Sequence, residues 1–290
     1  MQEVLVVGHV CIDQNRKDGS ALKETAGSPA MFMEKIFREL PDCKLTIVAP
    51  YGADFEPYRS SVSLYPTMAQ GITTMRYENI VTEHGRTQQC FYWEDAKPVP
   101  IDEQMVDYIK SAQIVCLAPL APTIPASYVR QIKSLMNSES KLLMLPQGYF
   151  RTIQEDHSVH VRDFREAPDM LPHTDIIIVS DEDHPDMLST ALTWSRRYGS
   201  SVVVTQAEEG ATVVQNGKIT PVPTQPVKPI DIVNSVGAGD ILSAGVMYML
   251  SRKHTLVEAV QFGNALARQC LFMKPDAIHI DFEALVLGTV

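Results

Sequence analysis

Short hydrophobic runs alternate with longer amphipathic stretches along most of this chain. The runs are rich in β-branched residues, and they cover residues 4–8, 45–49, 113–118, 141–145, 175–179 and 201–205. Helical periodicity is found near residues 29–40, 102–110, 125–137, 186–198, 240–252 and 255–272. Strands that alternate with helices in this way are typical of βαβ units. The pattern therefore predicts one three-layer α/β domain over residues 1–290, with a mostly parallel central sheet flanked by helices.

One region breaks this alternation and predicts a β-hairpin. Two strand-like runs, 73–81 and 86–93, are separated by the turn sequence at 83–85. We expect this hairpin to form a small β lid, made of residues about 14–25 and 71–95. A plain antiparallel addition to the edge of the central sheet is the alternative. Farther along, Asn216-Gly217 predicts a second hairpin, because a type I′ turn needs a positive φ at both central residues.

Composition and charge exclude several classes of protein. With 45% hydrophobic residues and 35 acidic against 25 basic residues, the chain can bury a large core and carries a formal charge of -10. We find no stripe of Lys and Arg, so a nucleic-acid partner is not expected. The five cysteines are scattered without a CxxC pair, which argues against a disulfide framework or a zinc knuckle. No long apolar run or signal peptide is recognised, so we expect a cytoplasmic protein without a membrane partner.

The segment 234–245, NSVGAGDILSAG, carries the strongest chemical signal. Gly237, Ala238 and Gly239 precede an apolar helical stretch, and Asp240 lies in its first turn. Glycines allow a ligand close to the backbone, and the N-terminus of a helix attracts anions. An aspartate beside a bound phosphate is useful when it accepts a proton from an attacking hydroxyl. Phosphoryl transfer needs this combination, whereas a glycine turn in which Asp240 only caps the helix is the alternative.

The string GAGD followed three residues later by Ala-Gly resembles the signature of the ribokinase-like (PfkB) family of carbohydrate kinases. The resemblance implies a ribokinase-like fold, ATP as donor, Asp240 as catalytic base and an anion hole at 237–239. The family's opening strand ends in a glycine followed by a substrate-binding aspartate, which Asp13 matches. It would bind substrate hydroxyls; an exposed turn acid is the alternative. Gly27 matches the family's GG-containing segment, and close approach of the backbone to substrate is its implied role.

Two further segments resemble parts of the family that border the reacting groups. Residues 141–151 resemble its central strand and the loop near the active site, in a form similar to inositol-kinase-like branches, and imply substrate contacts for Gln147 and Arg151. Asp183 stands where the family has the acid of an N-x-x-E motif, so the resemblance implies a water-mediated Mg²⁺ contact. The alternative for Asp183 is an acid at a helix start, and the alternative for Arg151 is a surface position.

The resemblance also assigns a nucleotide site. Residues 201–214 resemble the strand, turn and strand that border the nucleotide, with Thr205 and Gly210 as candidate contacts. Asn264 is the polar residue expected beside the adenine, although a packed helix explains its neighbours equally well.

Three positions depart from the family pattern. Met31 replaces an asparagine that contacts sugar, and Asn234 and Val236 replace an acid and a threonine before GAGD. The second change removes oxygen ligands near the monovalent-cation loop, so we do not expect K⁺ activation. Since apolar pockets discriminate weakly between hydroxylated substrates, the identity of the acceptor stays open.

The sequence therefore predicts an ATP- and Mg²⁺-dependent kinase that phosphorylates a hydroxyl of a small sugar or polyol. One alternative is a nucleoside kinase of the same fold, with the aromatic residues 91–93 available for stacking. Another is a catalytically weakened ligand-binding protein. A dinucleotide-dependent dehydrogenase is disfavoured because residues 7–13 lack GxGxxG. Arg76 and Arg86 in the lid are candidates for an anionic substituent or for plain solvated charge, and the lid is also a candidate homodimer contact.

Overall fold

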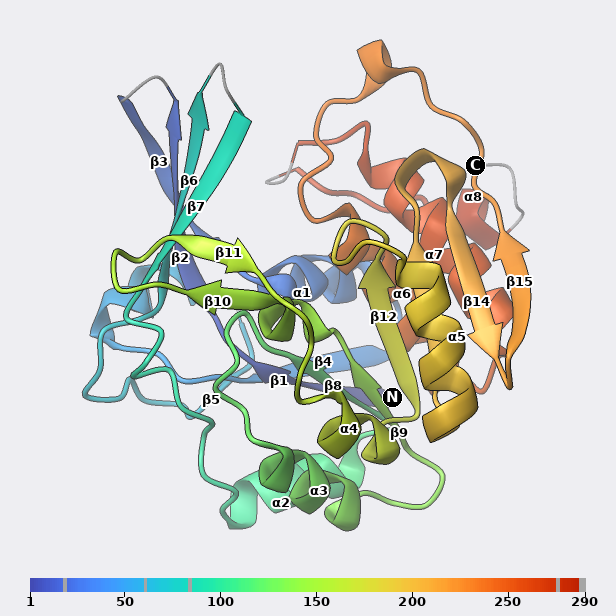
Figure 1. Ribbon diagram of the computed structural model, residues 1–290, viewed down its shortest axis with the longest axis horizontal. Helices are drawn as coiled ribbons and strands as arrows, with labels where there is room; N and C mark the ends of the chain where they lie inside the picture. Colours follow the sequence, from blue (N-terminus) through green and yellow to red (C-terminus); the bar gives the residue numbers. More distant parts are fainter. Residues whose placement is uncertain (18–19, 60–61, 83–84, 275–276, 287–290) are drawn as a thin grey trace.

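The computed structural model describes residues 1–17, 20–59, 62–82, 85–274 and 277–286 (Figure 1). Within them, a nine-stranded sheet has the order β15-β14-β13-β12-β9-β8-β1-β4-β5. All neighbours from β13 to β5 pair in parallel, and β14 and β15 are antiparallel additions. The strands are β1 (Gln2–Gly8), β4 (Cys43–Val48), β5 (Leu64–Tyr65), β8 (Ile114–Ala118), β9 (Lys141–Met144), β12 (Ile176–Ser180), β13 (Ser201–Thr205), β14 (Ala211–Gln215) and β15 (Lys218–Val222).

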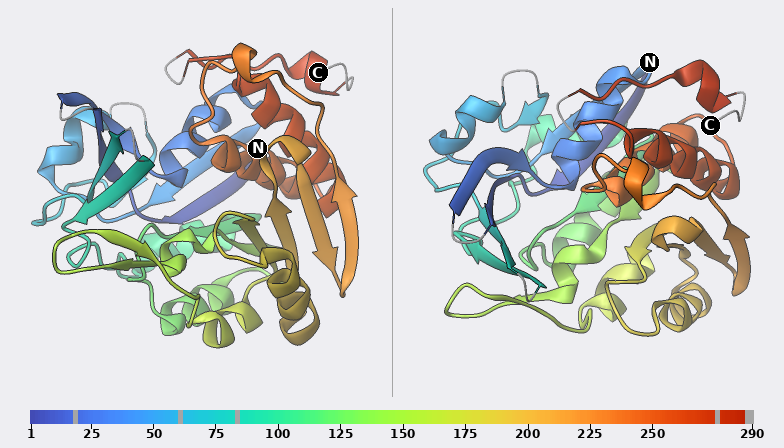
Figure 2. Two further views of the ribbon diagram at one scale, coloured as in Figure 1. Left: turned by 45° about the horizontal axis from the view of Figure 1, so that its top comes forward. Right: turned by 90° about the horizontal axis from the view of Figure 1, so that it is seen from above.

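Helices cover both faces of this sheet, so the predicted three-layer architecture is confirmed (Figure 2). One layer contains α1 (Pro29–Glu39), α6 (Ala238–Ser251), α7 (Leu256–Cys270) and α8 (Phe282–Val286). The other contains α2 (Glu103–Ser111), α3 (Ala126–Leu135), α4 (Ala167–Met170) and α5 (Met187–Tyr198). None of the described helices is both long enough and apolar enough to cross a bilayer.

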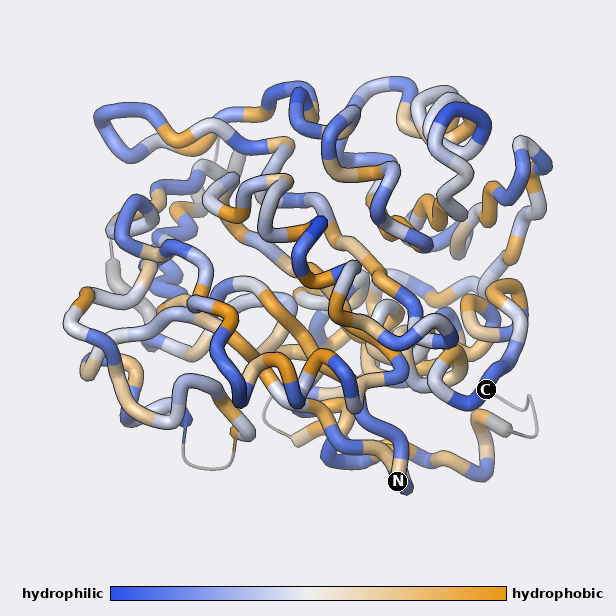
Figure 3. The backbone as a smooth tube through the Cα atoms, turned by 90° about the horizontal axis from the view of Figure 1, so that it is seen from below, coloured by the Kyte–Doolittle hydropathy of each residue, from blue (hydrophilic) through white to orange (hydrophobic). Residues whose placement is uncertain are grey.

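The strands are hydrophobic on both sides because both faces are covered. In β1, Val4 and Val6 belong to the core under α1, α6 and α7, whereas Leu5 and Val7 belong to the core under α2, α3 and α5. Successive side chains of a strand point to opposite faces, so a strand buried on both faces reads as a continuous apolar run. Figure 3 shows these runs as hydrophobic segments through the middle of the molecule.

Helix α6 is apolar around its circumference, which matches its position. It packs against α1, α7, β1 and β8, and residues 241–248 are all buried. A helix without a polar face is stable only where protein surrounds it. The first turn of α6 is the exception, since it carries Asp240 and reaches the edge of the sheet.

A second sheet, with the order β3-β2-β6-β7, stands apart from the central one (Figure 1). It contains β2 (Cys11–Lys17), β3 (Ser20–Gly27), β6 (Arg76–Thr82) and β7 (Gly85–Phe91). The hairpin predicted over 73–93 is confirmed as β6 and β7, and the first two residues of its predicted turn lie outside the described residues. An addition to the edge of the central sheet was the wrong alternative. We call this four-stranded sheet the lid.

A further hairpin was not predicted from the sequence. Its strands, β10 (Arg151–Ile153) and β11 (Val159–Val161), pair with each other in antiparallel fashion. Strands of three residues are too short for a period-2 pattern to stand out. By contrast, the hairpin predicted at Asn216-Gly217 joins β14 and β15, and both of its turn residues have positive φ, 51° and 71°.

His9 ties β1 to the loops at the base of the lid. It is fully buried; its Nδ1 accepts a hydrogen bond from Leu120 N at 3.0 Å, and its Nε2 lies 3.0 Å from Ala96 O and 2.9 Å from Thr123 Oγ1. A proton on Nε2, donated to the Ala96 carbonyl, satisfies both ring nitrogens. Burial lowers the pKa of His9 to about 4.

This lowered pKa predicts a loss of stability in acid. Between about pH 6.5 and pH 4 the unfolded chain protonates His9 while the folded chain does not, which destabilises the fold by about 3 kcal/mol over that window. In His9→Gln, one acceptor and one donor remain without titration, so the free energy of unfolding should depend less on pH there. Urea unfolding at several pH values measures both slopes. Equal slopes for the two proteins would contradict a neutral, buried His9.

Candidate active site

The carboxyl ends of the parallel strands meet at one edge of the sheet, and the predicted site residues gather there. Arg151 follows β9, Asp183 follows β12, and Thr205 ends β13. Asp13 lies on β2, which continues from β1 into the lid. In open parallel sheets this edge is the usual position of a ligand site.

Asp13 and Gly27 are packed against each other inside the lid. Cys11 pairs with Gly27 and Asp13 pairs with Thr25 between β2 and β3. A methyl group at Gly27 would lie 2.1 Å from Oδ2 of Asp13, so a larger residue would displace the carboxylate. The Sγ of Cys11 lies 3.5 Å from Oδ1 of Asp13. Gly27 thus makes room for Asp13, and the close approach of its backbone to substrate stays a prediction.

The loop before α6, where the sequence predicts an anion hole, turns at Gly237. Gly237 is the N-cap of α6 and has a φ of 81°, which a residue with a side chain rarely adopts. Ala238 and Gly239 form the first turn, where N–H groups have no carbonyl four residues earlier within the helix. A side-chain atom at Gly239 would meet nothing within 4 Å. Gly239 therefore presents its backbone to open space beside Asp240, whereas Gly237 packs against Phe32 and the Ala238 N–H donates to the carbonyl of Ser235 at 3.2 Å.

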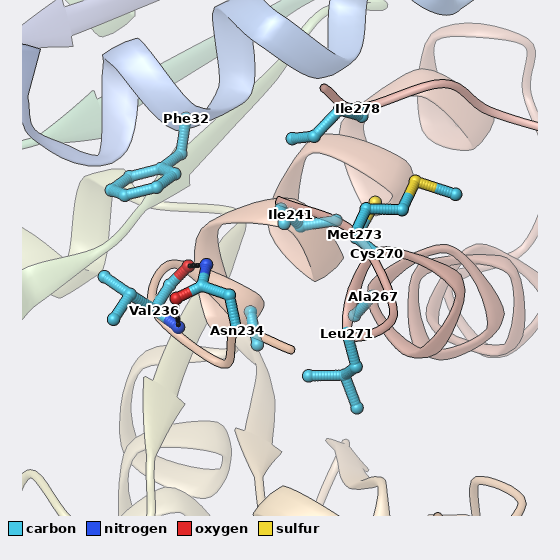
Figure 4. Close-up of a pocket in the computed structure, with 10 residues that line it drawn as sticks. Phe32, Asn234, Val236, Ile241, Ala267, Cys270, Leu271, Met273 and Ile278 are labelled. Atoms are coloured by element: carbon cyan, nitrogen blue, oxygen red, sulfur yellow. Dashed lines mark hydrogen bonds between the residues drawn. The ribbon is translucent and has the colours of Figure 1, made fainter. Parts of the chain in front are cut away.

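A hollow on the other side of this loop is lined mainly by apolar side chains (Figure 4). The ring of Phe32 lies against Gly237, where an added methyl group would come within 2.6 Å of it. The side chain of Asn234 bonds both the N–H and the carbonyl of Val236, each at 3.4 Å. The hollow also includes Cys270, Leu271 and Met273. Packing and a local side-chain turn thus hold the loop.

The pKa of Asp240 is raised far above that of an ordinary aspartate. Burial raises its pKa to about 7, the Arg151 guanidinium lowers it in part, and the charge of Asp13 raises it further. These three residues come from β2, β10 and α6, so the fold brings together groups that are far apart in the sequence. A carboxylate with a pKa near 7 can accept a proton at neutral pH more readily than an ordinary aspartate can.

Arg151 is held against the lid by Tyr77. Its Nη1 donates to the hydroxyl of Tyr77 at 3.2 Å, and its guanidinium lies 5.4 Å from the centre of the Tyr77 ring. The same hydroxyl donates to the carbonyl of Leu120 at 2.8 Å. Tyr77 sits opposite Asp13 in the β2–β6 register, so both side chains lie on the same face of the lid. Sequence reasoning missed Tyr77, because its place beside Asp13 depends on the register between β2 and β6.

Gln147 and Asp183 lie on the body side of the site. Within residues 142–150 only Gln147 is not buried, so its side chain reaches the surface there. Oδ2 of Asp183 accepts a hydrogen bond from Ser180 N at 2.8 Å. Burial raises the pKa of Asp183, whereas the Ser180 N–H and the Arg151 guanidinium lower it. Arg151 therefore acts electrostatically on both Asp183 and Asp240.

The predicted nucleotide residues occupy two places. Thr205 pairs with Ser180 at the ends of β13 and β12, close to Asp183 in the fold. Gly210 and Asn264 lie around Val222: a methyl group at Gly210 would come within 2.6 Å of the Val222 carbonyl, and Asn264 Nδ2 donates to that carbonyl at 2.8 Å. Asn264 is buried, so its amide fixes α7 to β15 rather than lying open at the surface.

Other lid residues face away from Asp13. Arg76 pairs with Ile12 rather than with Asp13 in the register, and its Nη1 lies 2.5 Å from Glu24 Oε1. The side chain of Arg86 lies outside what the structure describes. Phe91 pairs with Arg76, so it shares the outer face, and Tyr92 is 48% exposed. Trp93 packs at the base of the lid against the cluster that contains Tyr77.

Comparisons with known proteins bear on the family and the fold of the chain. The family model described as pfkB family carbohydrate kinase matches residues 63–275. A cytidine kinase of Thermococcus kodakarensis is 24% identical over 289 residues, which cover 93% of this chain and 96% of that protein. The structure of Arabidopsis thaliana ribokinase with ribose and ATP has a TM-score of 0.75 at 16% identity, covering 99% and 97% of the two chains. A pyrophosphate-dependent myo-inositol-1 kinase converted into a myo-inositol-3 kinase gives 0.76 at 16% identity, covering 99% of each chain.

Titration can measure how the charges of Arg151 and Asp13 act on Asp240. The carboxyl carbon of Asp240, followed by ¹³C NMR, should titrate with a midpoint near pH 7. In Asp13→Asn the midpoint should fall, because a repelling charge is lost, and in Arg151→Gln it should rise, because an attracting charge is lost. Opposite shifts would mean that these charges do not act on Asp240 as the geometry indicates.

Proposed function

The chain belongs to the pfkB family of carbohydrate kinases, and on that premise we propose that it transfers the γ-phosphoryl group of ATP to a hydroxyl of a small sugar or polyol. The family and the ribokinase fold that the sequence predicted are confirmed, so the protein is a phosphotransferase. The observation that carries the proposal is Asp240, a carboxyl group with a pKa near 7 beside the backbone loop 237–239.

In the proposed reaction, Asp240 accepts the proton of the acceptor hydroxyl. The hydroxyl oxygen then bonds to the γ-phosphorus as the bond from that phosphorus to the bridging oxygen breaks, and ADP leaves. Within the proposed anion hole 237–239, the N–H groups of Gly237 and Gly239 stabilise negative charge on the transferring group, since the Ala238 N–H donates to the carbonyl of Ser235. Arg151 acts electrostatically on Asp240, and its positive charge can also stabilise the negative charge of the transferring group. Asp13 orients the acceptor by accepting hydrogen bonds from its other hydroxyls.

Mg²⁺ fits this site as an ion held mainly by ATP phosphates and water. One oxygen of Asp183 is bonded to the Ser180 N–H, so the carboxylate can offer the other oxygen to a metal-bound water. The described residues contain no group of three or more His, Cys, Asp or Glu side chains placed to bind a metal on their own. When bound, Mg²⁺ would neutralise charge on the phosphates. We propose no role for K⁺, because the hollow behind the loop is lined mostly by apolar side chains.

The inner face of the lid favours a hydroxyl-rich acceptor. Asp13, Tyr77 and Asn79 share this face by strand alternation, and Gln88 Nε2 donates to Asn79 Oδ1 at 2.8 Å. Carboxylate and amide groups recognise hydroxyls through directional hydrogen bonds. Residues 91–93, the aromatic side chains considered for stacking a base, lie on the outer face or at the base of the lid. Arg76 forms an ion pair with Glu24, so it is less available to bind an anionic substituent of the substrate.

A nucleoside is the second candidate acceptor. The similarity to a cytidine kinase covers 93% of this chain and supports it. Pyrophosphate is a second candidate donor, since three of the similar structures are of pyrophosphate-dependent kinases. An ATP-dependent reaction suits the cytoplasmic location expected from the sequence. A homodimer formed through the lid stays a prediction.

An acceptor and donor screen tests the proposed function. Polyols, sugars, sugar phosphates and nucleosides are each supplied with ATP and Mg²⁺, and ADP release is measured; a parallel series uses pyrophosphate and measures phosphate release. We expect acceptor-dependent ADP release with a polyol or sugar. If only nucleosides were phosphorylated, the acceptor would be a nucleoside and not a sugar or polyol. Ligand binding without turnover on any acceptor would favour a ligand-binding protein.

Asp240→Asn isolates the proton acceptor. Because asparagine has nearly the same size but cannot accept the hydroxyl proton, we expect kcat to fall by about 10²- to 10⁴-fold while the melting temperature and ATP affinity stay close to those of the parent. Steady-state kinetics and calorimetric ATP titration make the comparison. Asp181→Asn, an exposed acid near the same edge of the sheet, is the matched control. If Asp240→Asn turned over at the parental rate, Asp240 would not be the catalytic base.

A further inference from the structure

The tip of the β10–β11 hairpin is fastened to the edge strand of the lid. Cys90 N donates to the carbonyl of His157 at 2.9 Å, and Gln89 forms an isolated antiparallel bridge with Ser158. In addition, Gln89 Nε2 donates to the carbonyl of Asp156 at 3.3 Å. In Figure 1 the hairpin runs from the central sheet toward the lid. Backbone contacts thus join the tip of the hairpin to β7, while β10 and β11 form a two-stranded sheet of their own.

Side chains reinforce this junction on both of its faces. The rings of Phe91 and His157 lie 4.4 Å apart between centroids at an angle of 41°. His157 has a φ of 68°, an unusual conformation for a residue with a side chain. On the inner side, Ile153 and Val159 pack against the buried cluster that contains Tyr77 and Cys90. The hairpin is therefore bonded to the lid rather than only lying near it.

The other end of the hairpin carries Arg151. Arg162 Nε donates to the carbonyl of Arg151 at 3.0 Å and so clamps the two strands at their base. The Arg151 guanidinium lies over Tyr77, a residue of lid strand β6. The tip of the hairpin contacts β7, and Arg151 at its base contacts β6. Any movement of the lid relative to the body would therefore act on Arg151 through two contacts.

We propose that the β10–β11 hairpin is a third segment of the lid, and that His157 and Phe91 are positioning residues that hold Arg151 over Tyr77 when the lid covers the acceptor. The inference rests on the proposed kinase function. It makes the lid discontinuous in sequence, built from β2–β3, β6–β7 and β10–β11. Arg151 then approaches the reacting groups only together with the lid, which couples the position of this charge to the exclusion of water.

Two variants of Phe91 test the positioning role. Phe91→Leu removes the ring pair, and Phe91→Tyr retains it as the matched conservative control. We expect kcat/KM for the acceptor to fall about fivefold in Phe91→Leu, with more ADP released per acceptor phosphorylated and an unchanged KM for ATP. Phe91→Tyr should restore the parental values. If Phe91→Leu kept the parental kcat/KM and the parental ratio of ADP released to acceptor phosphorylated, the proposal would be overturned. A purely structural role of Phe91 would change only the melting temperature.

A reversible cross-link tests whether hairpin and lid move together. Gln89→Cys/Ser158→Cys places thiols at a directly paired position, and peptide mass mapping after oxidation identifies the bond. If the two segments form one body, turnover of the oxidised protein should stay within about twofold of the reduced protein. A loss of more than about tenfold that a reductant reverses would show that they separate during turnover, against the proposal.

Amide hydrogen exchange tests the role of the hairpin without depending on which acceptor the enzyme phosphorylates. Amides of β7 and of residues 151–161 should gain protection together when ATP and an acceptor candidate bind, and Phe91→Leu should uncouple the two segments. Glu155→Ala, an exposed change at the same hairpin tip, is the control. Absence of phosphorylation on every acceptor would contradict the proposed function, whereas independent exchange of the two segments in the parent would contradict the hairpin's role alone.

Discussion

The burial of the Asp240 carboxyl group among charged neighbours is the constraint around which the active site is built. Burial disfavours the charged form of Asp240 and is the largest cause of its raised pKa, and the charge of Asp13 adds to the increase, so a nearby cation is needed to offset them. Arg151 supplies that cation, and it lowers the pKa of Asp240 that burial and Asp13 raise. The result is a carboxyl group poised between its two protonation states near neutral pH. Tyr77 holds the guanidinium, so the ionisation of a residue on α6 depends on a side chain in the lid.

The loop before α6, the predicted anion hole, is held in place by several contacts. In this chain Phe32 packs against the back of Gly237, and Asn234 bonds the backbone of Val236. Val233 and Asn234 also donate their N–H groups to the carbonyl of Leu271 near the end of α7. These contacts come from α1, from the loop itself and from α7, so they fix its conformation from three directions. Fixed backbone dipoles stabilise a developing charge without reorganising during the reaction.

Most of the fold followed from the sequence because long apolar runs and amphipathic helices leave few alternatives. The strands of the parallel sheet and α1, α6 and α7 lie close to their predicted positions. For the candidate site, the sequence predicted positions: residues 237–240 lie at the start of α6, and Asp13 and Arg151 lie on strands beyond the central sheet. The roles of these residues stay predictions. The β10–β11 hairpin was not predictable, because its short strands are stabilised by the lid rather than by their own pattern. Tyr77 could be found only from the β2–β6 register, which a single sequence does not state.

The contact between Gly27 and Asp13 has a consequence for comparing this chain with its relatives. The two residues lie on adjacent strands, and the carboxylate occupies the space where a side chain at position 27 would begin. Natural variation at the two positions should therefore be correlated. Relatives with an acid at the position of Asp13 should keep glycine at the second position, and relatives that have lost the acid should be free to carry alanine or serine there. An alignment could then sort family members by how they hold the acceptor, without knowledge of what any of them phosphorylates.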